Sequence, residues 1–188
     1  MPVFDDNVWD SHPQDFLLLQ HGHVHLVRHE WALDRLLTDL QALDYPVVAA
    51  DFASCADADA ARAAVIAAIH EWPADYGATT WPGFCDGLTD YLLDVATPQR
   101  VLVLNRFDRF ADRNHEEAER LLDLLVGCAR WHLLFGRRLI CLVQTDNPEL
   151  SFDDLGAEPA SWNPHEWLLA HRMGERLPPW IAHDRAGD

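Results

Sequence analysis

The chain has 188 residues, 49% of them hydrophobic, which suits one ordinary domain with extensions. Its 31 acidic and 14 basic residues give a formal net charge of −17. This charge argues against nucleic acid and anionic membranes as partners and favours a basic protein. No apolar run reaches membrane-spanning length and no basic-then-apolar leader opens the chain, so we expect a cytoplasmic protein.

Residues 1–44 are predicted to form an N-terminal extension. Two strand-like runs, Phe16–Gln20 and His23–Arg28, flank His21-Gly22 and predict a β-hairpin. Glu30–Leu43 follows with leucines at helical spacing, which predicts an amphipathic helix.

Three histidines occur at every second position from the turn into the second of these runs. His21, His23 and His25 would project from one face of a strand. We interpret them as a solvated strand face, with a zinc or nickel site as the alternative.

The centre of the chain, residues 45–147, has the pattern of an α/β domain. Pro46–Ala50, Val101–Leu104 and Leu139–Val143 are almost wholly apolar runs, which is typical of strands covered on both faces. Helical patterns over Asp57–His70 and Asn114–Arg130 lie between them. Because parallel strands need such crossovers, we predict a parallel sheet of three strands packed with helices.

Residues 148–188 are predicted to form a C-terminal extension. Residues 150–160 have the composition of a loop. Asn163 followed by Pro164 predicts the start of one short helix, since Asn caps helices and Pro is accepted in their first turn.

The stretch from Trp72 to Leu93 carries the strongest functional pattern. Trp72-Pro73 should end any preceding helix, and residues 74–79 read as an exposed loop. Thr80 can cap a new helix that accepts Pro82 in its first turn. That helix should place acidic side chains on one face and apolar ones on the other. The acidic face comprises Asp86, Asp90 and Asp94, and the apolar face Phe84, Leu88, Tyr91 and Leu92.

Charge and aromatic side chains together make this stretch a candidate binding surface. Residues 38–94 hold ten acidic residues against Arg62 alone. Trp72 is interpreted as a plug at the end of the core. Tyr76 and Trp81, near Gly77 and among polar residues, are candidates for partner contact, because aromatic anchors in a charged rim are typical of protein-binding hot spots.

Enzymatic activity is not indicated by any motif in the chain, which lacks the glycine-rich phosphate loops and the hydrolase and zinc-protease signatures. A pairing of Cys85 with His70 is conceivable, but nearby aspartates would disfavour a thiolate. Asp86 with Asp90 could act as an acid–base pair, although carboxylates four residues apart usually line a solvated helix face. The four cysteines occur singly and are expected to be free thiols: Cys55, Cys85, Cys128 and Cys141.

The order Tyr76-Gly77, Trp81, Asp86 and Leu88, after a Trp-Pro break and on an acidic helix, resembles the barstar family of ribonuclease inhibitors. The resemblance covers about residues 45–144. Matching Asp86 to the family's central aspartate requires one extra loop residue. Thr80 then stands where Asn is usual, and Pro82 where the family has its first Asp.

The resemblance implies a barstar-like α/β fold and an inhibitor or immunity protein that blocks the active site of a basic ribonuclease or related toxin nuclease. No cofactor or metal is implied, and the free protein is expected to be a monomer. The alternative is a barstar-like interaction domain that no longer inhibits a ribonuclease, because one helix carboxylate is replaced by Pro82. The implied partner-binding residues are Tyr76, Gly77, Thr80, Trp81, Asp86 and Asp90.

Overall fold

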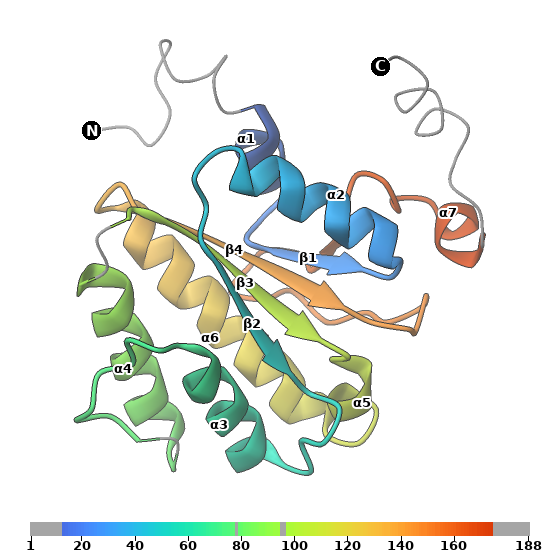
Figure 1. The fold of residues 1–188 in the computed structure, drawn as a ribbon. Helices are drawn as coiled ribbons and strands as arrows, with labels where there is room; N and C mark the ends of the chain where they lie inside the picture. The colour runs from blue at the N-terminus through green and yellow to red at the C-terminus, as the bar shows by residue number, and fades with distance from the viewer. Residues whose placement is uncertain (1–12, 78, 95–96, 175–188) are drawn as a thin grey trace.

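The computed structural model describes residues 13–77, 79–94 and 97–174 (Figure 1). Its helices are α1 (Pro13–Leu19), α2 (Glu30–Gln41), α3 (Ala58–Ala68), α4 (Trp81–Asp94), α5 (Asp108–Ala111), α6 (His115–Leu133) and α7 (Leu169–Met173). Its strands are β1 (Val24–Val27), β2 (Val47–Asp51), β3 (Gln99–Asn105), β4 (Arg138–Gln144) and β5 (Ser161–Trp162). Within these ranges, no helix is both long and apolar enough to cross a membrane.

The strands form one parallel sheet in the order β2-β3-β4-β1-β5. The three apolar runs of the central region form β2, β3 and β4 as neighbours, which confirms the predicted α/β class and parallel core. Among the described residues the sheet nevertheless has five strands, two more than the three predicted for the central region. The two additional strands come from the segments before and after the central region, and β1 lies inside the sheet, between β4 and β5.

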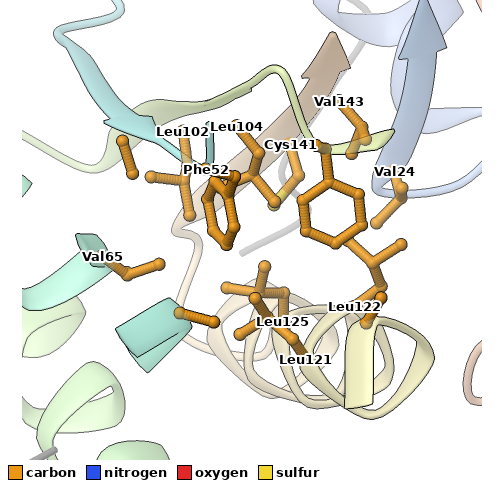
Figure 2. Packing of buried hydrophobic residues seen from close by; sticks show 14 of the residues in the cluster. Val24, Phe52, Val65, Leu102, Leu104, Leu121, Leu122, Leu125, Cys141 and Val143 are labelled. Atoms are coloured by element: carbon orange, nitrogen blue, oxygen red, sulfur yellow. The ribbon is translucent and has the colours of Figure 1, made fainter. Parts of the chain in front are cut away.

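Helices cover both faces of the sheet (Figure 1). Alternate residues of β3 divide between the two cores, because side chains on a strand point to opposite faces. Val101 and Val103 pack with the buried stripe of α2, whereas Leu102 and Leu104 pack with α3, α4 and α6. Figure 2 shows the second core, where Leu102 and Leu104 of β3 and Cys141 and Val143 of β4 lie over the leucines of α6.

The predicted N-terminal hairpin is wrong. Phe16–Gln20 lies mostly in helix α1, and the run after it forms a single strand, β1, that is parallel to both of its neighbours. A short apolar run fits a buried helix as well as a strand, and here tertiary contacts decide. Leu18 enters the core beneath α2.

A buried polar group fixes α1 to the sheet. Asp15 is fully buried and accepts hydrogen bonds from the Tyr45 hydroxyl at 2.7 Å and from Arg138 Nη1 at 2.8 Å. Arg138 also donates to Gln99 Oε1 at 3.3 Å. Helix α1 is therefore part of the folded body, since removing Asp15 would leave a buried guanidinium without this carboxylate.

The predicted solvated face of histidines is also wrong. His21 lies before β1, while His23 and His25 are only 3% and 1% exposed. Their ring nitrogens bond to backbone carbonyls, His23 Nδ1 to Leu139 at 3.2 Å and His25 Nε2 to Gly22 at 3.1 Å. Burial lowers the pKa of His25 to about 4. Among the described residues, no group of three or more His, Cys, Asp or Glu side chains is placed to hold a metal ion.

The C-terminal segment differs from its prediction as well, because its helix begins at Leu169 and not at Asn163. The polar side chains expected to start the helix instead bond to the end of β1. Asn163 Nδ2 donates to the carbonyl of Leu26 at 3.0 Å, and the buried Glu166 accepts from the backbone N–H groups of Arg28 and His29 at 2.9 Å each. These bonds hold the segment between β5 and α7 against the end of β1.

Candidate protein-binding surface

The predicted start of helix α4 is confirmed. α3 ends at Ala68, before Trp72-Pro73, and α4 begins at Trp81. Thr80 Oγ1 accepts a hydrogen bond from the Gly83 N–H at 3.2 Å, the bond expected of an N-cap. Pro82 occupies the first turn, where its missing N–H costs nothing.

The loop before α4 packs directly on the helix. The Trp72 ring stacks on Phe84 with centroids 5.6 Å apart, and its Nε1 donates to the carbonyl of Tyr76 at 2.8 Å. Gly87 makes this approach possible, because a Cβ there would lie 2.4 Å from a Trp72 ring atom and 2.8 Å from Tyr76 Cβ. Trp72 is half-buried, in keeping with its interpretation as a plug.

Tyr76 joins the loop to the acidic face of α4. Its hydroxyl donates to Asp90 Oδ2 at 2.7 Å, and this hydrogen bond raises the pKa of Tyr76. Asp86, one turn earlier, is exposed and has no hydrogen bond or ion pair with any described residue. The two carboxylates therefore differ: Asp90 is held by the loop, and Asp86 is open to a partner.

Trp81 is held from two sides. Its Nε1 donates to Glu117 Oε2 of α6 at 3.0 Å, and the Arg62 guanidinium of α3 lies 4.4 Å from its ring centroid. Arg62 is itself paired with Asp59. Trp81 is consequently half-buried, and it joins α3, α4 and α6 at the start of α4.

The exposed arc of α4 has a clear order. Each residue of a helix is rotated by about 100° from the one before it. Around the axis of α4, the exposed side chains therefore follow one another in the order Cys85, Thr89, Asp86 and Asp90. Cys85 borders α6, with its sulfur 3.7 Å from that of Cys128, and Asp90 borders the loop. Pro82 lies one turn earlier in the middle of this arc. The buried side comprises Phe84, Leu88 and Tyr91, as predicted, while the side chains of Leu92 and Asp94 lie outside the described residues.

The six predicted binding residues all lie in the loop and in α4, but not on one side of the helix: Asp90 faces the loop, whereas Trp81 faces α6. Gly77 and Thr80 are exposed, and a Cβ added at Gly77 would meet no atom within 4 Å. Sequence reasoning missed two neighbours of Trp81. The Asp59–Arg62 pair has a readable i,i+3 spacing, but Glu117 lies 36 residues from Trp81 and has no local signal.

Negative charge dominates this surface. Asp75, Asp86, Asp90 and Glu117 lie along the loop and α4, while the nearby cations Arg62 and Arg120 are paired with Asp59 and Glu117. Exposed carboxylates beside half-buried aromatic rings can accept charge-assisted hydrogen bonds from a cationic partner. The Cys85 thiol contacts Cys128, and no contact among the described residues joins it to His70.

The family comparison identifies the same region. A family model described as Barstar (barnase inhibitor) matches residues 45–144, just over half of the chain. The match begins before β2, ends with β4 and includes the loop and α4. Among curated proteins, none matches the chain.

Proposed function

The chain belongs to the barstar (barnase inhibitor) family, and from that premise we propose that it inhibits a basic ribonuclease or related toxin nuclease by occupying the active site. The observation that carries the proposal is Asp86: an exposed carboxylate on a packed helix, with no hydrogen bond or ion pair to any described residue, beside a loop already packed in place.

The physical basis is mimicry of a phosphate group. A ribonuclease binds phosphate with Arg, Lys and His side chains, and a carboxylate can accept the same charge-assisted hydrogen bonds. Within the described part of the chain, Asp86 has no hydrogen bond or ion pair to break before it binds. Because α4 is anchored by its buried face, little conformational freedom is lost on association, which favours affinity.

The surrounding residues would orient the contact. Asp90 keeps one carboxylate oxygen beyond its bond to Tyr76, which leaves an acceptor for a second cation. Tyr76 and Gly77 would form the loop contact, Thr80 would lie at the start of the helix, and Trp81 would cover the rim of the partner's site. The account requires no cofactor, no nucleic acid and no catalytic activity of the chain itself, and it treats the free protein as a monomer and as an immunity protein against its target.

The alternative function is a protein-interaction domain that no longer inhibits a ribonuclease. The specific observation in its favour is Pro82, which is exposed in the middle of the binding arc and offers no carboxylate there. Such a domain would bind its partner without blocking nuclease activity, so a binding assay and an inhibition assay separate the two functions.

The experiment is capture of candidate basic nucleases from the same organism, followed by binding kinetics at several salt concentrations. The proposal expects a nuclease partner and an association rate that falls as salt rises, because the −17 chain steers a basic protein. Capture of a partner that is not a nuclease would favour the interaction domain.

A further inference from the structure

Two thiols meet at the edge of the candidate binding surface. Cys85 of α4 and Cys128 of α6 place their sulfurs 3.7 Å apart, and Thr89 Oγ1 lies 3.7 Å from the Cys128 sulfur. Cys85 is half-exposed, whereas Cys128 is 4% exposed. Both are free thiols in this structure. Cys85 is therefore the more accessible of the two thiols, and Cys128 is the buried one.

We propose that Cys85 and Cys128 form a modification site for peroxides, which oxidise the pair to a disulfide that ties α4 to α6. A disulfide brings the two sulfurs to about 2.0 Å, so they must approach each other from their present van der Waals contact. The two sulfurs already meet across the contact between α4 and α6, so forming the bond draws these two helices locally closer.

The chemistry uses the two thiols in order. The Cys85 thiolate attacks one oxygen of the peroxide, the O–O bond breaks, and the sulfur becomes a sulfenic acid while water or an alcohol leaves. The Cys128 sulfur then attacks the Cys85 sulfur, the S–O bond breaks, and the departing hydroxide takes the Cys128 proton as water. The two thiols lose two electrons in total, and the peroxide gains them.

The difference in burial decides which thiol reacts first and how fast the disulfide closes. Burial, and then the neighbouring Cys85, raise the pKa of Cys128 to about 12, so the half-exposed Cys85 reacts first and ring closure is faster at higher pH. The remaining cysteines are placed differently. Cys55 contacts the backbone carbonyls of Asp51 and Ala60, and Cys141 is fully buried in β4.

Oxidation would also act on partner binding, a consequence that rests on the proposed function. Cys85 directly precedes Asp86, so drawing the Cys85 sulfur toward α6 moves the backbone that carries the binding carboxylate. We expect oxidised protein to bind its ribonuclease about ten-fold more weakly, and reductant to restore the affinity.

The test is intact mass and peptide mapping after treatment with hydrogen peroxide, without any partner present. The expected result is a monomer that loses two hydrogens, regains them with reductant, and yields one peptide pair joined through Cys85 and Cys128. Cys85→Ser and Cys128→Ala should each abolish the loss, while the matched variant Cys55→Ala retains it. Oxygen addition without hydrogen loss, a bridge to another cysteine, or a link between chains would overturn the proposal.

The mapping on wild-type protein stands even where a variant folds poorly. The affinity of oxidised protein for the ribonuclease is a separate measurement. If the disulfide forms and the affinity stays unchanged, the effect on binding is refuted but the modification site is not. Failure to find a ribonuclease partner would refute the proposed function and leave the mass result intact.

Discussion

Replacement of Gly87 by alanine tests how the loop is held on the binding helix. The added Cβ would lie 2.4 Å from the Trp72 ring and 2.8 Å from Tyr76 Cβ, and neither group can move alone because both belong to the packed loop. Overpacking of this kind costs about 1–3 kcal/mol. Alanine also stabilises a helix interior by about 1 kcal/mol relative to glycine. The net change in unfolding free energy should therefore lie between roughly zero and a loss of about 2 kcal/mol.

Gly127 of α6 provides the matched control. It is also inside a helix, but it is exposed, and a Cβ there would meet nothing within 4 Å. Gly127→Ala should stabilise the protein by about 1 kcal/mol, since only the helix propensity changes. The two variants should thus differ by about 1–3 kcal/mol in urea denaturation.

The same pair of variants also tests whether the packing of the loop on α4 affects partner binding as well as stability. In Gly87→Ala the loop must move away from α4, so the Tyr76–Asp90 hydrogen bond should weaken, and partner binding with it. Equal stability changes for Gly87→Ala and Gly127→Ala would refute the packing of the loop on the helix.

Three further predictions follow from buried or bonded groups. Asp15→Ala should cost about 3–5 kcal/mol in urea denaturation, because it leaves the buried Arg138 without its carboxylate; a loss below about 1 kcal/mol would contradict the role given to α1. Burial lowers the pKa of His132 from 6.5 to about 4, so between these pH values the unfolded chain binds a proton that the folded protein does not, and stability is lost as the pH falls from 6.5 toward 4. His132→Leu should reduce this loss, measured as urea midpoints at neutral pH and between pH 6.5 and 4, and an unchanged pH dependence of the midpoint would contradict the prediction. Asp90→Ala should lower the pKa of Tyr76 toward its ordinary value, seen as earlier phenolate absorbance at high pH, because the hydrogen bond that raises it is removed.

The parts of the fold that were predictable rest on local patterns. The runs around Leu102 and Leu142 are apolar without alternation because both faces of their strands are covered, and that pattern is visible without knowing the neighbours. The start of α4 was equally readable, since the Thr80 cap, Pro82 and the buried Phe84 all lie within five residues.

The parts that were missed depend on contacts between distant residues. The run that forms α1 reads equally as strand or helix until Asp15 meets Arg138, 123 residues away. His23 and His25 read as a polar face, yet each is buried with a backbone carbonyl as its partner. In the candidate site, Asp86 could be proposed from the sequence because it stands in a local pattern, whereas the contact of Glu117 with Trp81 exists only because the fold brings α6 beside α4.

The most direct test of the proposed function is titration of a basic barnase-type ribonuclease with the chain while RNA cleavage is followed. The account predicts stoichiometric inhibition by the wild type. Asp86→Ala should weaken it by about 2–5 kcal/mol, thirty-fold or more, because the nuclease cations are left buried and unpaired. Asp34→Ala removes the same charge from an exposed position on α2, across the sheet from α4, and should inhibit almost as well as the wild type. Equal small losses in the two variants, or binding of the ribonuclease without inhibition, would contradict a carboxylate in the active site.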